Sequence, residues 1–516
     1  MVAEVVSSPN IVFWVVSFLP LLSTIVIVWR PALALPIIFG WIAIVDLLKR
    51  LLWYDADQTV PSILYQLILV IPDVLLIIAT LRVAVSLWVS RTLSIKPQLV
   101  DGLFALFFIW SVLNIFNPKL DSLYLGLVGF RSANLYILTY FLARSIPKNK
   151  LRPLLRQLAI VLAAGTVFAV IYTLVQVQVG LHPFEIRWLK SGETVVASQD
   201  QVQGLFGTFR PISTFANHEQ LGWWLGTSIV FLSALTGPTW LYLLIAAPSA
   251  FIIIRTLSRS SWAFTGASLV IVLITSLIDR SRQPMVRSLV VIAVLIISFV
   301  VWTQLGASLS NIDELDTVID GPGRTTEVIE STNMDSFVAR ATTVGTLEWR
   351  VFTIQALLGD PSWRTLLGNG MGSMWYAARF NIEGAILPTS EEVRASGALN
   401  LPPGKRILSH IGLVDYVYEL GIVGVLIFLA ASVIAILNAW RRLHATVQPL
   451  ARNIGFSFIA IVLAILLVNS SFANTLPNAR SVAIVYWGLL GLLVTISMHP
   501  DAFERVPSSS ETASPR

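Results

Sequence analysis

A polar stretch between two apolar runs, GTFRPISTFANHEQLGWW (207–224), carries the first residues that suit chemistry. Arg210 stands near its start. A guanidinium stays charged and binds oxyanions through its planar fork, so Arg210 is a candidate phosphate ligand. Asn217 lies in the same stretch and is a second candidate for substrate binding. The competing interpretation is structural, because a polar loop with a helix cap commonly precedes an apolar helix.

Two further arginines lie in RTLSRSSW (255–262). Arg255 and Arg259 are four residues apart, so they share a face if the stretch is helical. They are then candidate ligands for the same anion. The alternative is that both are anchors at the end of a membrane span, with their apolar stems in the lipid and their guanidinium groups at its surface.

A fourth arginine and a histidine occur farther along the chain. Arg350 lies in the amphipathic stretch EWRVFTIQALLGDPSW (348–363), where most arginines simply face solvent. His410 follows Ser409, a typical helix N-cap residue, in LSHIGLVDYVYELGIVG (408–424). A helix N-terminus favours the neutral imidazole that a general base requires. His410 is therefore the candidate catalytic residue, weighed against the commoner structural histidine at a helix start.

Taken together, these residues suit a donor that carries a lipid-linked diphosphate. The arginines would hold the diphosphate and neutralise it as it leaves, and the histidine would accept a proton from an acceptor hydroxyl. No DxD-type pair of acidic residues, the usual mark of a metal-dependent sugar-nucleotide enzyme, stands out in the polar segments. The sequence therefore predicts a reaction without a metal or another cofactor.

Membrane helices are the elements that must position these residues. Hydrophobic residues make up 55% of the 516 residues and charged residues only 12%, about half the charged share of a soluble domain. Apolar runs near 20 residues recur, and each is long enough to cross a bilayer as a helix. We predict an all-α polytopic membrane protein with about 12–13 transmembrane helices. The predicted spans are 11–29, 32–49, 62–88, 99–116, 122–143, 153–179, 220–236, 239–255, 260–278, 286–305, 411–437, 453–472 and 480–497.

The charges of the loops give these spans a direction, because Lys and Arg concentrate in cytoplasmic loops. One alternation places four basic loops in the cytoplasm, with their charges within 91–96, 144–152, 280–287 and 441–452. The same alternation puts the polar segments 180–219 and 306–410, and all the candidate residues, at the periplasmic face. Lys49 and Arg50 contradict the rule, so either the first spans are drawn wrongly or these charges meet lipid phosphates.

The chain is predicted to have four parts. They are an N-terminal transmembrane bundle (1–305), a large periplasmic loop with short helices (306–410), C-terminal transmembrane helices (411–498) and a disordered cytoplasmic tail (499–516). The absence of cysteine excludes thiol catalysis, disulfides and thiolate metal sites. The net charge of +6 is a sign of topology rather than of nucleic-acid binding.

Four stretches, in this order, resemble the O-antigen ligase and polymerase family. FRPISTFANHEQLG is similar to its RP-TFANPN-LG stretch, and SRSSW is similar to its SRG-W motif. WRVFTIQALLGDPSWRTLLGNGMGSM resembles its R-W-AL-----PLLGVGPG stretch, and SHIGLVDYVYELGIVGVLIFL resembles its HN-YL---E-GI-GLLLF stretch. The resemblance covers roughly residues 100–500 and depends on the ordered set rather than on any single motif.

This resemblance implies a GT-C-like glycosyltransferase of the bacterial inner membrane, with an active site that faces the periplasm. Such proteins take a glycan from undecaprenyl diphosphate. Ligases pass it to lipid A core, and polymerases pass it to another lipid-linked repeat unit. The family's phosphate-binding arginines match Arg210 and Arg259, its loop arginine matches Arg350, and its proposed catalytic histidine matches His410. The implied partners are the undecaprenyl-diphosphate-linked glycan, a glycan or glycolipid acceptor, and membrane lipids.

The sequence departs from the family's pattern in three places. His218 follows Asn217 where proline is usual, the pair Ser260 and Ser261 stands where the family often has glycine, and Ile411 stands where asparagine often follows the histidine. These changes keep the charged groups, so they question the substrate more than the reaction class.

Two other functions stay open at this point. A transporter or flippase for a lipid-linked or small anionic solute would place ionisable residues at a midplane cavity, and Asp46, Asp73 and Arg131 are its candidates. A structural subunit of an envelope complex would need no such site. Large outer segments and arginines gathered at the outer boundary favour the enzyme.

Overall fold

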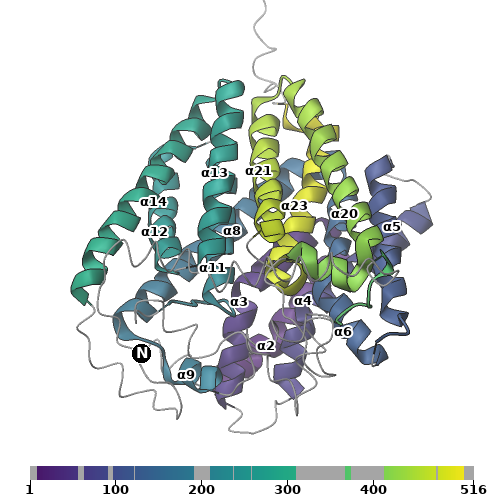
Figure 1. Cartoon of the computed structure of the whole chain (residues 1–516), viewed down its shortest axis with the longest axis horizontal. Coiled ribbons are helices and arrows are strands. Elements are labelled where there is room, and N and C mark those ends of the chain that lie inside the picture. Colours follow the sequence, from purple (N-terminus) through teal and green to yellow (C-terminus); the bar gives the residue numbers. More distant parts are fainter. Residues whose placement is uncertain are drawn as a thin grey trace, which may run out of the picture.

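The chain folds as a bundle of helices (Figure 1). The computed structural model describes residues 9–55, 63–90, 97–120, 122–190, 210–235, 237–256, 258–309, 366–373, 412–471 and 475–504. None of these residues forms a strand. In this part of the chain nine helices are long and apolar enough to cross a membrane, or ten if one bent pair counts as a span. The prediction of an all-α polytopic membrane protein is confirmed.

The first half of the bundle contains two long helical hairpins and several short helices. Its elements are α2 (Pro9–Trp29), η1 (Pro31–Leu33), α3 (Ala34–Asp55), α4 (Ile63–Ser90), α5 (Leu99–Leu113), η2 (Asn114–Phe116), α6 (Leu123–Ala133), η3 (Leu135–Ile137), α7 (Leu138–Arg144), α8 (Lys148–Val179) and α9 (Pro183–Lys190).

The second half contributes the centre of the bundle. Its elements are α11 (His218–Ser233), α12 (Thr239–Arg255), α13 (Arg259–Ile278), α14 (Arg282–Leu309), α20 (Gly412–His444), α21 (Pro449–Ser471), α22 (Thr475–Asn478), α23 (Arg480–Met498) and η5 (Pro500–Phe503). Helix α23 packs on α7, α20 and α21, and 94% of its apolar window is buried inside the protein. Helix α23 is therefore the central helix of the bundle, whereas α14, with 28% of its apolar window buried, lies at the periphery.

Four predicted spans, 11–29, 122–143, 220–236 and 239–255, are not among the nine, so the described residues contain nine or ten candidate spans rather than the 12–13 predicted. In the first of them, Ser17–Trp29 is an apolar helix shorter than a full span. Helices α11 and α12 have only 16 and 17 residues and do not meet the length of a full span. The predicted span 122–143 is a pair of helices that meet at an angle of 40° around Asn134. Hydropathy alone does not detect these differences, because a short or broken apolar helix inside a bundle is as hydrophobic as a continuous span.

Three of the four basic loops share one end of the bundle, and the fourth, 91–96, lies outside the described residues. Figure 1 shows that the α13–α14 and α20–α21 hairpins turn at the same end, at the top of the view. The start of α8 joins them there, because η5 contacts both α8 and α21, and Lys148 pairs with Asp501 of η5. The start of α13 and the short helix α9 lie toward the opposite end. This arrangement agrees with the alternation predicted from the loop charges.

Helices α11 and α13 approach each other unusually closely. Gly222 of α11 faces Ser261 of α13, and one turn later Gly226 faces Thr265. A Cβ atom added at either glycine would overlap the opposing side chain. Small residues spaced four apart are a common way to bring two membrane helices together. This contact fixes the start of α13 beside the start of α11.

Gly222→Ala should force α11 and α13 apart and destabilise the protein by about 1–3 kcal/mol, the usual cost of overpacking. Gly266→Ala on α13 is the matched control, because a Cβ there meets no atom within 4 Å and alanine favours a helix. Thermal unfolding of both variants in the same detergent checks the prediction. Equal melting temperatures would show that the two helices are not in tight contact.

Candidate functional site

Arg210 lies just before α11 and faces the first residue of that helix. Its Nη1 atom is 3.5 Å from Nε2 of His218. Since a guanidinium can only donate, Nε2 must accept, and the ring proton of a neutral His218 is then on Nδ1. Nε of Arg210 and Nδ1 of His218 are neighbouring polar groups, and both are buried without hydrogen-bond partners among the described residues.

The turn between α12 and α13 brings two more arginines to the same end. Arg255 is the last residue of α12, and Arg259 is the first residue of α13. Ser258 separates the helices and caps α13 by accepting a hydrogen bond from the backbone N–H of Ser261. The stretch is thus not one helix, and the condition under which Arg255 and Arg259 would share a helix face is not met. They flank a turn instead.

Two members of this arginine cluster (Arg210, Arg255 and Arg259), namely Arg210 and Arg255, have no acidic partner among the described residues. Burial and the nearby charge of Arg259 both lower the pKa of Arg210. Nε of Arg255 and the hydroxyl of Thr214 are also buried without hydrogen-bond partners in this part of the chain. Buried polar groups normally have partners, so this cluster suits an anionic ligand.

Asn217 is the N-cap of α11. Its side-chain oxygen accepts a hydrogen bond of 2.8 Å from the backbone N–H of Gln220. This is the structural alternative that the sequence offered for the stretch. The cap occupies the amide oxygen, so any contact of Asn217 with substrate would use its NH₂ group, and that role stays a prediction.

A hydroxyl network links the two helices beside the arginine cluster. Glu219 of α11 accepts a hydrogen bond from the hydroxyl of Ser260, and its backbone carbonyl accepts one of 3.1 Å from the hydroxyl of Ser261. The hydroxyl of Ser258 lies 3.0 Å from that of Ser260. The sequence analysis assigned no role to Glu219, since nothing in its spacing connects it with Ser260, 41 residues away. Ser260 and Ser261, which stand where the resembled family often has glycine, therefore lie against Glu219, the residue after His218.

A buried ion pair supports the loop that carries Arg210. Arg50 of α3 donates to Glu185 of α9 over 2.7 Å and also to the backbone carbonyl of Ser213. Gln176 of α8 completes the network, because its NH₂ group donates to Glu185 and its oxygen accepts from the backbone N–H of Ser213. Arg50 and Glu185 are both 0% exposed. Ser213 has a positive φ of 51°, so these bonds hold a backbone conformation that serine rarely adopts.

This network explains the charges that broke the loop-charge rule. Arg50 is inside the protein and paired, so the expectation that it meets a lipid phosphate is wrong. Lys49 is half-buried, with its Nζ 5.2 Å from the centre of the Trp188 ring. A paired, buried arginine carries no information about membrane sidedness, because the rule applies to charges in loops.

His410 and Arg350 lie outside the described residues. The described part of the long outer segment is the glycine-rich turn 366–373, which docks on α20. Helix α20 is broken at Gly421, where φ is 74°. The break exposes the carbonyls of Tyr418 and Glu419, which accept hydrogen bonds from the backbone N–H groups of Asn369 and Gly370. The turn is thereby fastened to the start of the helix that follows His410 in sequence.

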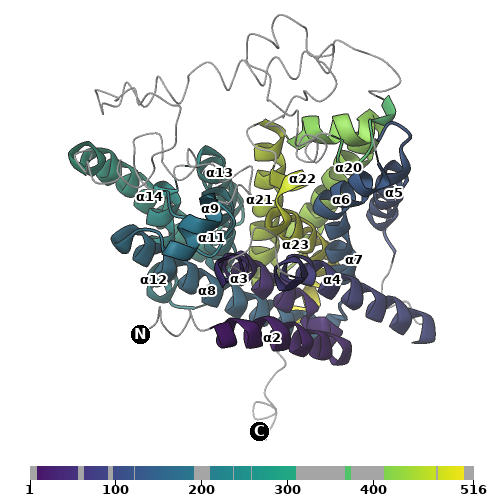
Figure 2. The same ribbon diagram turned by 90° about the horizontal axis from the view of Figure 1, so that it is seen from below.

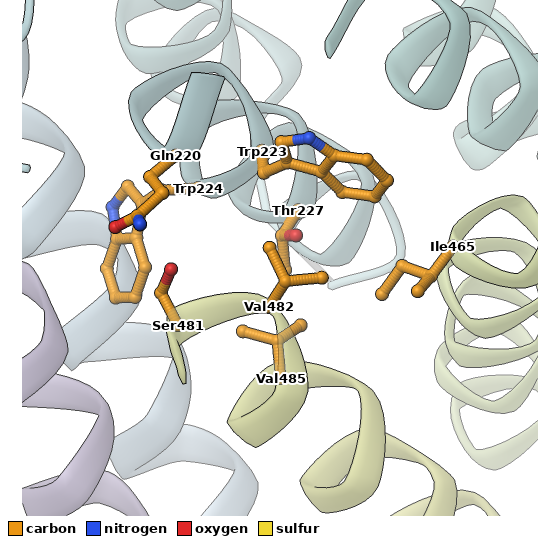
Figure 3. Close-up of a pocket in the computed structure, with 8 residues that line it drawn as sticks. All are labelled: Gln220, Trp223, Trp224, Thr227, Ile465, Ser481, Val482 and Val485. Atoms are coloured by element: carbon orange, nitrogen blue, oxygen red, sulfur yellow. The ribbon is translucent and has the colours of Figure 1, made fainter. Parts of the chain in front are cut away.

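A narrow cavity lies along the first turns of α11, between this helix and α23 (Figure 3). Gln220, Trp224 and Thr227 of α11 face Ser481 and neighbouring valines of α23 across it, and Ile465 of α21 flanks it. The indole N–H of Trp224 and the hydroxyl of Ser481 are buried without hydrogen-bond partners among the described residues. Such a lining suits a water molecule or another small polar group.

The candidate transport residues have structural partners. Arg131 donates to Asp73 over 2.6 Å, and Tyr136 donates to the other oxygen of Asp73 over 2.8 Å. Asp46 is buried, and its backbone carbonyl accepts from Nε of Arg50. These residues join helices to each other. In the described ranges, no group of three or more His, Asp or Glu side chains is arranged to hold a metal ion.

Comparison with known proteins gives no relative. No family model matches the chain, and no curated protein is significantly similar to it. Any functional assignment beyond a helical membrane protein with many spans therefore rests on the sequence and the geometry.

Glu185→Gln should destabilise the protein by roughly 3–5 kcal/mol, because it leaves the Arg50 charge buried without a counter-charge. Asp501→Asn is the control: it breaks the ion pair with Lys148, which is exposed and should contribute less than about 1 kcal/mol. Thermal unfolding in detergent measures both variants. If the two variants lose the same stability, the buried pair is not the main support of this region.

Proposed function

We propose that this chain is a glycosyltransferase of surface polysaccharide assembly in a bacterial inner membrane. It transfers a glycan from undecaprenyl diphosphate, at the periplasmic face, to a glycan or glycolipid acceptor, as in the O-antigen ligase and polymerase family that its motifs resemble. The proposal joins the four ordered motifs in the sequence to the arginine cluster at one end of the bundle.

The single observation that carries the proposal is that Arg210 and Arg255 each bury Nε without a hydrogen-bond partner, and have no acidic ion-pair partner, among the described residues. Arg210 is half-buried, and both this burial and the nearby charge of Arg259 lower its pKa. A fold keeps such a like-charge arrangement when a ligand compensates it, and strain of this kind concentrates at functional sites. A diphosphate supplies two adjacent anionic groups, and each suits an arginine fork.

In the proposed reaction, the arginines stabilise the leaving group. The bond between the anomeric carbon and the diphosphate oxygen breaks, and its electron pair goes to undecaprenyl diphosphate. Arg210 and Arg259 neutralise the charge that develops there. The acceptor hydroxyl forms the new bond to the anomeric carbon, and His410 takes the hydroxyl proton as general base. Arg255 and Arg350 would add positive charge around the diphosphate.

The transport alternative has less support. It needs ionisable residues that face a midplane cavity, whereas Asp73, Arg131 and Tyr136 are bonded to one another within the bundle. The arginine cluster lies at the start of α11 and α13 rather than at their middles. An anion held there is at the boundary of the membrane, where a large polar acceptor can reach it.

Arg259→Lys should lower the rate of transfer roughly 10- to 100-fold, because lysine keeps the charge but cannot form the bidentate fork. Arg282→Lys is the matched control, since Arg282 begins α14 at the opposite end of the bundle. Both proteins are reconstituted with an undecaprenyl-diphosphate-linked glycan, and product is measured at equal protein amounts. Full activity of the Arg259 variant would make that residue only a membrane anchor.

His410→Ala should lower transfer by roughly 100- to 10,000-fold, the usual contribution of a general base, without loss of folded protein. His444→Ala serves as control, because His444 ends α20 at the other end of the helix, where it stacks on Trp440. Unchanged activity of the His410 variant would remove that residue from the mechanism while leaving the arginine cluster in place.

The same assay distinguishes the possible acceptors. One reaction contains only the lipid-linked repeat unit, and a parallel reaction adds lipid A core or another host glycolipid. Longer lipid-linked chains identify a polymerase, and glycan on the second acceptor identifies a ligase. If well-folded protein gives neither product but moves the lipid-linked glycan across a vesicle bilayer, the transport function replaces the proposed one.

A further inference from the structure

An apolar groove on the outside of the bundle lies far from the arginine cluster. It runs between α2, η1, α3 and α8, which pack together (Figure 2). The groove has a volume of about 470 Å³, within the range of sites for small molecules. Its lining is apolar except for Ser23 and Gln157. Ser23 is already satisfied, since it donates to the carbonyl of Leu19 and accepts from the indole of Trp41. A polar ligand would therefore gain little inside the groove.

On two sides of the groove, an arginine lies one helical turn beyond the residues that line it. On α2, Leu22 and Val26 line the groove, and Arg30 continues the same four-residue spacing directly after the helix. On α8, Ile160 lines the groove and Arg156 precedes it by four residues, on the same face.

Both arginines lie at the same end of the groove. Arg30 precedes η1, which contacts the start of α8. Arg30, Arg156 and Arg152, one further turn along α8, are exposed and form no ion pair with an acidic side chain in the described ranges. One end of the apolar groove is thus close to a group of exposed positive charges.

Aromatic residues place this cluster at a membrane surface. Trp29 precedes Arg30, and Trp88 lies near the end of the neighbouring helix α4; they are 81% and 82% exposed. Exposed tryptophans of membrane proteins concentrate at the level of the lipid head groups. Leu22 precedes Arg30 by eight residues, which is about 12 Å along a helix. This length is close to the roughly 15 Å of one hydrocarbon leaflet.

We propose that this groove is a binding site for one anionic phospholipid of the leaflet at the end of the basic hairpins. One acyl chain occupies the apolar groove, and the phosphate head group meets Arg30 and Arg156. The charge complementarity selects anionic over zwitterionic lipids, since each basic residue near the surface attracts anionic lipid. The site is separate from the proposed donor site, which lies at the other end of the bundle.

Native mass spectrometry of the full-length protein tests the proposal directly. Detergent-purified protein is titrated with phosphatidylglycerol or, in parallel, with phosphatidylcholine of the same acyl chains. The expected result is a first bound phosphatidylglycerol at a concentration at least tenfold lower than for phosphatidylcholine. Equal binding of the two lipids to the wild-type protein would overturn the proposal without any variant.

Two kinds of variant locate the lipid. The double change Arg30→Gln and Arg156→Gln should weaken phosphatidylglycerol binding about 10- to 30-fold. Its control, Arg282→Gln with Arg441→Gln, removes two exposed arginines from the hairpin turns and should leave the first site intact. An equal loss in both double variants would mean general charge attraction and would overturn the proposal.

The acyl chain is tested by filling the groove. Gly40 lines it, and a Cβ there would sit 3.7 Å from Val161, an ordinary contact. Gly40→Ala should therefore bind lipid like the wild type, whereas Gly40→Phe should block the groove and abolish the first bound phosphatidylglycerol. Undiminished binding by a folded Gly40→Phe variant would show that the lipid lies elsewhere.

Discussion

The buried ion pair between Arg50 and Glu185 is the interaction on which the arginine-cluster end of the bundle depends. It joins α3 to α9, and through Gln176 and the backbone of Ser213 it joins both to α8 and to the loop before α11. A charge in this apolar setting is tolerated only with a partner and further hydrogen bonds. The chain supplies those partners from three elements far apart in sequence. The loop that contains Arg210 is therefore held in one conformation by groups that have no direct part in chemistry.

Close packing of α11 on α13 is the second contact that positions the arginine cluster. Gly222 lets the helices touch, and the hydroxyls of Ser260 and Ser261 bond to Glu219 across the contact. The start of each helix carries one of the proposed phosphate ligands. Their separation is set by backbone packing rather than by flexible side chains, which is the condition for a site that binds charge without reorganising. The serines that depart from the family's glycine pattern have a structural explanation here, since they provide the hydroxyls that bind Glu219.

The sequence was sufficient for the membrane fold because burial of apolar runs determines it. Runs such as 153–179 appear as α8 in nearly the predicted place, and the loop charges predicted the shared end of the hairpins. The sequence was not sufficient to predict contacts between residues that are far apart in the chain. Nothing near Arg50 identifies Glu185, 135 residues away, and nothing near Ser260 identifies Glu219. The cap at Asn217 was one of two interpretations that its spacing allowed. The break between Arg255 and Arg259 depends on Thr256 ending α12 and on Ser258 capping the start of α13. Such tertiary contacts are not encoded in local periodicity.

The position of Arg210 also has a thermodynamic consequence. Burial and the repulsion by Arg259 both lower the pKa of Arg210 in the folded state only, so the charged guanidinium makes the fold less stable than its apolar packing alone would make it. A ligand that binds the folded state and removes this repulsion adds its binding free energy to the stability of the whole bundle. Folding and occupancy are therefore linked. If the proposed anionic donor binds there, the protein is most stable in a membrane rich in that donor, and extraction into neutral detergent removes the stabilisation.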